Sequence, residues 1–176
     1  RACFIDPYQG AAAATYAYKN LGYKKAAVLT DVANDYAVGL SNFFKKSYKK
    51  LGGELVADMK YSSGDQDFTA QLTELISKKP DIVFMPAYFA EGAIIMKQAR
   101  ELGATFRLMG ADAMDNPDTV KIAGKAAEGP PGAAQLLAQA GQLRHGPGHQ
   151  QRLGVVLKAQ ARADAAAKGH HVLQRR

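Results

Sequence analysis

Three side chains that could bind a small zwitterion follow apolar, strand-like segments of this sequence. Tyr36 lies shortly after the first such segment, Tyr88 follows the third, and Asp112 follows the fourth. A carboxylate binds an ammonium group through charge-assisted hydrogen bonds, and phenol rings cover apolar surface. Because ligands bind at the carboxyl edge of open parallel sheets, we expect these residues to form a binding site. In the simpler interpretation, the tyrosines pack on helix ends and Asp112 is a turn residue.

Motifs for catalysis are missing from residues 1–129. This part contains no glycine-rich phosphate loop, no G-x-S-x-G nucleophile elbow and no histidine, the commonest general base. Cys3 has no histidine near it in sequence, which disfavours a thiol nucleophile. Asp31 ends the first strand as a phosphoacceptor would, but that chemistry needs a second aspartate after the third strand, where Ala87 and Tyr88 stand. We therefore expect no enzyme and no cofactor.

The histidines all lie in residues 130–176. His145 and His149 are four residues apart, a spacing that on a helix could place both against one metal ion. Gly146, Pro147 and Gly148 stand between them and disfavour a helix there. The sequence therefore predicts no metal site.

The net charge of +7 is unevenly distributed along the chain. Residues 1–129 carry 16 Lys and Arg and 15 Asp and Glu, whereas residues 130–176 carry seven basic residues and the single acidic residue Asp164. Lysines 45, 46, 49 and 50 cluster on one side of a predicted helix, a pattern typical of a solvated helix face. We therefore expect no nucleic-acid partner.

Helix-like and strand-like segments alternate through residues 1–129. The predicted strands cover residues 25–30, 54–61, 81–86 and 106–110. The predicted helices cover residues 9–21, 35–51 and 90–102, with one between Asp67 as its cap and Pro80, and another beginning at Pro117. The buried face of helix 35–51 is expected to hold Leu40, Phe44, Ser47 and Leu51. Such alternation predicts an α/β fold in three layers, a parallel sheet with helices on both faces.

The composition changes abruptly after Gly129. Residues 130–176 contain no Phe, Tyr, Ile, Met, Ser, Thr, Asn or Glu, and Ala, Gln, Gly, Arg and Leu dominate. We therefore predict a folded domain over 1–129 and an aberrant, low-complexity basic tail over 130–176. One hypothesis is out-of-frame translation of a GC-rich gene; the alternative is a natural low-complexity extension that is helical from 153 to 168.

Several segments together resemble one family. They occur in a fixed order: Asp31 to Leu40 around Tyr36, Leu51 to Glu54, Tyr61 to Leu72, Pro80 to Tyr88, Lys97 to Gly103, and Gly110 to Asp112. The N-terminal run Cys3 to Gly10 is similar to the point at which the chain enters the second lobe. Over about 125 residues the sequence resembles the periplasmic solute-binding proteins of branched-chain amino acid ABC transporters, in their second lobe only.

The resemblance implies a non-catalytic, extracytoplasmic receptor. Such a protein closes two α/β lobes over an amino acid or a small amide and delivers it to an ABC permease in the membrane. By position, Tyr36 and Tyr88 look like the aromatic contacts of the second lobe, and Asp112 looks like the carboxylate that binds the α-ammonium group. Gly39 and Asp67 look structural, as a close helix approach and a helix cap.

The resemblance also implies that this chain is a truncated receptor. The first lobe, which supplies groups for the ligand carboxylate, has no counterpart here, so we expect this fragment to bind solute very weakly or not at all. The alternative is a ligand-sensing domain of a receptor or transcriptional regulator, which uses the same lobe architecture. A doubly wound enzyme has the least support.

Overall fold

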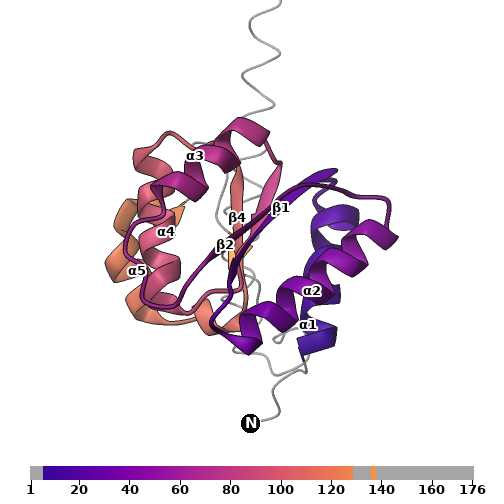
Figure 1. Ribbon diagram of the computed structural model, residues 1–176, viewed down its shortest axis with the longest axis horizontal. Coiled ribbons are helices and arrows are strands. Elements are labelled where there is room, and N and C mark those ends of the chain that lie inside the picture. The colour runs from indigo at the N-terminus through magenta and orange to yellow at the C-terminus, as the bar shows by residue number, and fades with distance from the viewer. Residues whose placement is uncertain (1–5, 129–135, 138–176) are drawn as a thin grey trace, which may run out of the picture.

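The chain folds as a parallel sheet between two layers of helices (Figure 1). The computed structural model describes residues 6–128 and 136–137. The strand order is β2-β1-β3-β4-β5, and every neighbouring pair runs parallel. The strands are β1 (Lys25–Asp31), β2 (Glu54–Tyr61), β3 (Ile82–Phe84), β4 (Arg107–Gly110) and β5 (Leu136–Leu137).

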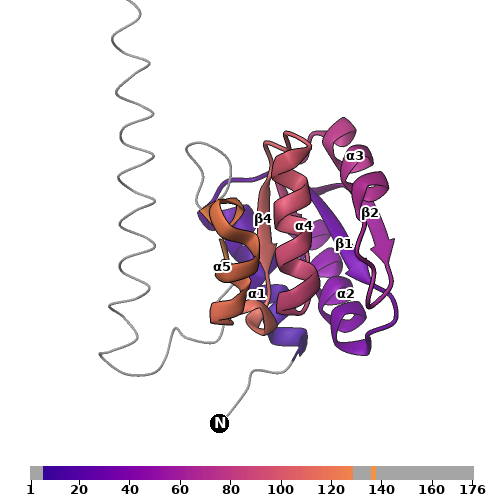
Figure 2. The same ribbon diagram turned by 90° about the vertical axis from the view of Figure 1, so that its left-hand side faces the viewer.

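Helices cover both faces of the sheet. In two perpendicular views, α1 and α2 lie together on one face, and α3, α4 and α5 cover the other (Figures 1 and 2). The predicted three-layer α/β architecture is therefore confirmed. The α-helices are α1 (Asp6–Thr15), α2 (Asp35–Lys50), α3 (Thr69–Lys78), α4 (Phe89–Glu101) and α5 (Pro117–Ala123). Shorter helical segments are a π-helical turn (Tyr16–Asn20) and two 3₁₀ segments (Asp112–Met114 and Gly124–Glu128).

The core between the sheet and the α1–α2 layer is rich in aromatic rings. The ring of Phe44 on α2 stacks on Phe84 of β3, with 4.4 Å between centroids, and on Tyr48, with 5.3 Å. A Cβ added at Gly10 would lie 2.7 Å from the carbonyl oxygen of Leu40, so α1 approaches the α2 backbone closely at this glycine. The chain before β1 contributes small buried side chains to this core: Ala13, Ala14 and Ala17.

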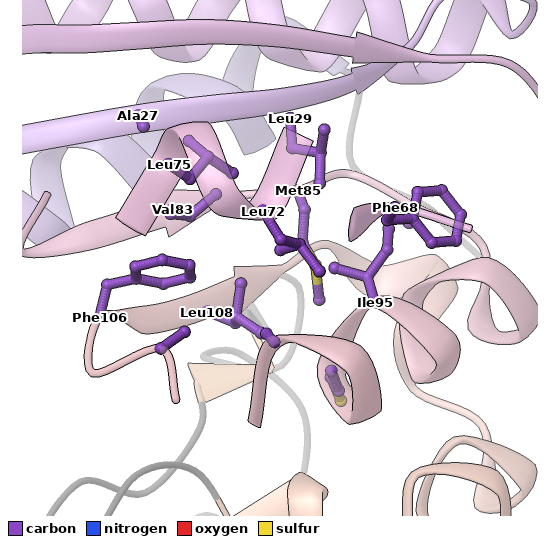
Figure 3. Close-up of a cluster of buried hydrophobic side chains, with 14 of the residues drawn as sticks. Ala27, Leu29, Phe68, Leu72, Leu75, Val83, Met85, Ile95, Phe106 and Leu108 are labelled. Atoms are coloured by element: carbon purple, nitrogen blue, oxygen red, sulfur yellow. The ribbon is translucent and has the colours of Figure 1, made fainter. Parts of the chain in front are cut away.

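The core on the other face is mostly aliphatic. Figure 3 shows side chains from β1, β3, β4, α3 and α4 meeting in this cluster. Its large members are almost completely buried, as the continuous apolar strands of a sheet covered on both faces require. The labelled residues are Ala27, Leu29, Phe68, Leu72, Leu75, Val83, Met85, Ile95, Phe106 and Leu108.

Two helical details differ from the sequence predictions. The helix predicted over 9–21 begins at Asp6 and changes to a π-helical turn after Thr15. On α2, the side chain buried after Phe44 is Tyr48, whereas Ser47 is only partly buried. The Tyr48 ring stacks on Phe44 and its hydroxyl donates a hydrogen bond to the carbonyl of Tyr23 at 2.9 Å, so the phenol is buried with its polar atom paired.

The two predicted helix-starting residues lie at the starts of α3 and α5, although the residue immediately before α3 is Phe68 rather than Asp67. The Asp67 carboxylate accepts a hydrogen bond of 2.9 Å from the backbone N–H of Thr69, just inside α3. Hydrogen bonding by Thr69 lowers the pKa of Asp67. Pro117 stands in the first turn of α5. A close approach at Gly39 stays a prediction; the contact described above lies at Gly10.

The described part of the sheet extends past residue 129. Met109 and Gly110 of β4 pair with Leu136 and Leu137 of β5. Two residues of the predicted tail thus belong to the sheet. The boundary at 129 and the frameshift hypothesis for 130–176 stay predictions, since most of that segment lies outside the described residues.

Candidate functional site

Tyr36 is held in the first turn of α2. The side-chain oxygen of Asn34, the residue that caps this helix, accepts a hydrogen bond of 3.0 Å from the Tyr36 backbone N–H. An asparagine cap satisfies a backbone donor that the first helical turn leaves without an intrahelical partner. The cap therefore fixes where α2 begins, and with it the place at which the partly buried Tyr36 side chain leaves the helix.

Tyr88 and Asp112 follow the next two strands of the sheet. Tyr88 is the extended residue immediately before α4, and its side chain is 49% exposed. Asp112 is exposed and opens the short 3₁₀ segment after β4. Because β1, β3 and β4 are parallel neighbours, the loops after them meet at one edge of the sheet.

The structure brings all three predicted site residues together. The Tyr36 hydroxyl donates a hydrogen bond of 2.5 Å to Oδ1 of Asp112. The rings of Tyr36 and Tyr88 are stacked, with 5.9 Å between centroids and 28° between planes. The result is an exposed carboxylate beside two phenol rings, an arrangement that can bind a cation next to an apolar group.

A glycine on α4 makes room for the segment that carries Asp112. A Cβ added at Gly92 would lie 2.0 Å from Sδ of Met114 and 2.6 Å from its methyl carbon. Met114 is completely buried and ends the 3₁₀ segment that Asp112 opens. The absence of a side chain at Gly92 thus lets the segment Asp112–Met114 pack directly against α4. Sequence reasoning missed this contact, because the two residues are far apart along the chain.

A second set of polar contacts lies at the carboxyl end of β1. Asp31 is 4% exposed; its Oδ2 accepts a hydrogen bond from the Ser63 hydroxyl, and its Oδ1 accepts one of 3.0 Å from the Ala33 N–H. Burial, and next the nearby Asp31 carboxylate, raise the pKa of the Tyr61 phenol. From the sequence, Asp31 was considered only as a phosphoacceptor; its position as a strand-ending aspartate before a turn was the available signal for this role.

Side chains of α4 hold the loop between β2 and α3. Glu91 accepts a hydrogen bond of 3.3 Å from the Gly64 N–H. Gln98, two helical turns further on, accepts one of 2.8 Å from the Phe68 N–H and donates one of 2.8 Å to the Gln66 carbonyl. One face of α4 therefore supplies partners to a loop that has no regular structure of its own.

Within residues 6–128 and 136–137, no group of three or more His, Cys, Asp or Glu side chains could hold a metal ion. The histidine pairs at 145 and 149 and at 170 and 171, and the thiol of Cys3, lie outside the described residues. For those groups the sequence predictions stand as stated.

Comparison with protein families gives a match along most of the chain. Residues 3–169 match the periplasmic binding protein family. The chain belongs to this family. The resemblance read from the sequence is thereby confirmed, and so is the fold class that it implied.

Relatives in the family are named as amino acid-binding proteins. The Leu/Ile/Val-binding protein BraC3 of Rhizobium johnstonii is 33% identical over 129 residues, which is 73% of this chain and 35% of that protein. The leucine-, isoleucine-, valine-, threonine- and alanine-binding protein of Pseudomonas aeruginosa is 29% identical over 125 residues, covering 71% of this chain and 33% of that protein. The chain therefore spans about a third of the length of these relatives.

Solved structures of two binding proteins share the fold. The leucine-binding protein LivK of Thermotoga maritima aligns with a TM-score of 0.70 and 49% identity, over 73% of this chain and 36% of that chain. LivJ of Streptococcus pneumoniae, a branched-chain amino acid transporter substrate-binding protein solved with isoleucine, aligns with a TM-score of 0.65 and 37% identity, over 69% of this chain and 34% of that chain.

None of the helices described here is long and apolar enough to cross a membrane.

Proposed function

We propose that this chain forms one wall of the solute site in an extracytoplasmic receptor of an ABC importer. The observation that carries the proposal is the contact between Tyr36, Tyr88 and Asp112 at the carboxyl edge of the sheet. Three segments that are far apart in sequence meet there and bring together a carboxylate and two aromatic rings. The solute is a branched-chain or related amino acid, or a small amide.

Each residue has a distinct role in this proposal. Asp112 accepts hydrogen bonds from the ammonium group of an amino acid, or from the N–H groups of a small amide. Tyr36 and Tyr88 cover the apolar part of the solute with their rings. A charge-assisted hydrogen bond to a carboxylate is stronger than a neutral one, so Asp112 contributes the largest share of the affinity.

The names of the family and of the relatives support the proposed location and partner. The family is described as periplasmic, and two similar solved proteins are a leucine-binding protein and a transporter substrate-binding protein. We accordingly propose delivery of the solute to a membrane permease, and no catalysis. The described residues offer binding groups at this edge rather than a nucleophile with a base beside it.

Taken alone, this chain binds its solute very weakly. The Tyr88 side chain is 49% exposed and Asp112 is also exposed, so the described residues form an open surface at this edge. A small-molecule site usually buries most of its ligand, and affinity depends on excluding water from the polar contacts. A second wall, comparable to the remaining two thirds of the relatives, is needed to enclose the solute.

A chimera tests the proposal directly. Residues 6–128 would replace the corresponding segment of Thermotoga maritima LivK, which is 49% identical to this chain where the two align. We expect calorimetry to show leucine binding to the chimera, a loss of at least about tenfold with Asp112→Asn, and no micromolar binding to the 176-residue chain alone.

A matched variant separates the site from general damage. Asp115→Asn removes an exposed carboxylate three residues further on and should leave leucine affinity close to that of the chimera. Full affinity in the Asp112→Asn chimera, or micromolar binding by the isolated chain, would contradict the proposal.

A further inference from the structure

The loop between β2 and α3 contacts both segments that carry the stacked rings. On one side, the Ser63 hydroxyl donates a hydrogen bond to Oδ2 of Asp31, the last residue of β1. On the other side, the Gln98 amide of α4 accepts one hydrogen bond from the loop backbone and donates another, each of 2.8 Å. The loop therefore links the turn that precedes Tyr36 to the helix that begins directly after Tyr88.

Asp31 connects Ser63 to the start of α2. Its carboxylate is 4% exposed, and a buried carboxylate needs hydrogen-bond donors. Ser63 supplies one to Oδ2, and the Ala33 N–H supplies one to Oδ1 at 3.0 Å. The next residue is Asn34, whose side-chain oxygen accepts a hydrogen bond of 3.0 Å from the Tyr36 N–H. Consecutive hydrogen bonds thus lead from the loop, through the turn after β1, to the first turn of α2.

We infer that Ser63 is a positioning residue, which acts through Asp31 and keeps the Tyr36 ring stacked on Tyr88. The inference rests on the proposed function for the use of this ring pair, which is to cover the apolar part of the solute. Because Ser63 is exposed, water can reach Asp31 when the hydroxyl is removed. Water is not attached to the loop, however, so the turn before Tyr36 loses its link to α4.

The 176-residue chain without solute is sufficient for the test, because the quantity measured is the geometry of the site. Nuclear magnetic resonance would follow the nuclear Overhauser effect between the rings of Tyr36 and Tyr88, whose centroids are 5.9 Å apart. It would also follow the hydrogen exchange of the Ala33 amide. In Ser63→Ala we expect a weaker ring contact. Exchange at Ala33 should be about tenfold faster, because opening the turn no longer breaks a hydrogen bond to a charged group.

Two matched variants separate the hydroxyl from other effects at this place. Ser63→Thr keeps a hydroxyl and should restore both signals. Ser62→Ala removes the hydroxyl of the exposed neighbouring residue and should change neither. The stack of Phe44 on Phe84, with 4.4 Å between centroids, reports whether α2 remains packed on the sheet. Its ring contact should be the same in all of these variants.

A second variant tests the same link from α4, and it serves also if Ser63→Ala does not fold. Gln98→Ala removes both hydrogen bonds between this helix and the loop backbone. It should weaken the contact between Tyr36 and Tyr88 in the same direction as Ser63→Ala. Lys97→Ala, a change at the exposed neighbouring residue, is the matched control and should leave the ring contact unchanged.

The outcomes distinguish this inference from the proposed function. A ring contact of full strength in Ser63→Ala or in Gln98→Ala would overturn the inference and leave the proposed site intact. If the contact between Phe44 and Phe84 weakens together with that of the site rings, Ser63 stabilises the whole domain, and the inference is again overturned. The proposed function fails separately, through the leucine affinity of the chimera and its Asp112→Asn variant, and that failure would not alter the effect of Ser63 on the rings.

Discussion

The two helical layers of this domain stabilise the same sheet with different side chains. The α1–α2 side combines close helix contact at Gly10 with a stack of rings around Phe44, whereas the α3–α5 side buries aliphatic residues such as Leu75. Tyr36 comes from the first layer, and Tyr88 starts a helix of the second. The contacts among the site residues therefore bridge the layers, and their geometry depends on both sides being packed on one rigid sheet.

The largest expected effect on stability comes from truncating one large buried side chain in either core. Phe44→Ala should lower the free energy of unfolding by about 3–5 kcal/mol and Leu75→Ala by about 2–5 kcal/mol, since each leaves a cavity among fully buried neighbours. Urea denaturation followed by circular dichroism measures both. If the layers fold as one unit, both variants show a single transition with the denaturant dependence of the parent. A biphasic curve for only one variant would show that the layers unfold separately.

Alkaline pH should weaken both layers, because each buries a tyrosine. Burial, followed by the Asp81 carboxylate, raises the pKa of Tyr48 to about 12 from a usual value of 10.0, and burial also raises the pKa of Tyr61. The folded state thus keeps phenol protons that the unfolded state releases. The stabilisation that depends on these phenol protons is complete below pH 10 and falls as the pH rises toward 12, by at most about 1.4 kcal/mol per pH unit for each tyrosine.

The Tyr61→Phe variant checks this pH dependence by urea denaturation at pH 8, 10 and 11. It keeps the ring that packs edge-on against Phe68, at 5.2 Å between centroids, and removes the proton that titrates. We expect a shallower loss of stability above pH 10 than in the parent. An identical slope would show that Tyr61 does not contribute.

Two of the tightly packed glycines, Gly10 and Gly92, should respond differently to alanine. Gly10→Ala places a Cβ against the α2 backbone, 2.7 Å from the Leu40 carbonyl oxygen, and should cost about 1–3 kcal/mol. Gly92→Ala collides only with the Met114 side chain. The Gly92→Ala/Met114→Ala double variant should therefore lose less stability than the sum of the two single variants, as thermal unfolding would show. Strict additivity would mean that this contact does not constrain the Asp112 segment.

The smallest expected effect on stability comes from the hydrogen bond that bridges the layers. Tyr36→Phe should change the free energy of unfolding by no more than about 1 kcal/mol, because the Asp112 carboxylate is exposed and water replaces the lost donor. Asp112→Asn should have a similarly small effect. A double-mutant cycle by chemical denaturation measures the coupling between them. A coupling of several kcal/mol would show that this contact stabilises the fold rather than preparing a site.

Local patterns were enough to predict most of the fold. The strand over 54–61 has the predicted bounds, and α2 ends one residue before the predicted Leu51. Strands and helices can be predicted from such local patterns because their signals span only a few residues. These signals are apolar runs, a glycine after the last turn of a helix, and an Asn or Asp before its first turn. The sequence also predicted that Tyr36, Tyr88 and Asp112 lie at one edge of the sheet, because segments that follow parallel strands meet at the carboxyl edge; their role as solute contacts stays a prediction.

Contacts between distant segments could not be predicted in the same way. Ser47 and Tyr48 both lie near the buried face of α2. Tyr48 is the one that is buried, with its ring stacked on Phe44 and its hydroxyl bonded to the carbonyl of Tyr23. The packing of the Met114 side chain on Gly92 likewise depends on how α4 and the segment after β4 lie relative to each other. The hydrogen bond from Tyr36 to Asp112 joins residues 76 positions apart, so the sequence predicted their proximity but not their bond.

The loop between β2 and α3 has a consequence for engineering. Surface loops usually accept inserted residues, because their backbone groups are bonded to water. Here Glu91 and Gln98 of α4 form hydrogen bonds to the backbone of Gly64, Gln66 and Phe68. The distance between these loop residues therefore has to fit the distance between two side chains that are two turns apart on α4. An affinity tag or reporter inserted at this loop would break that match, although the loop lies on the surface and has no regular structure.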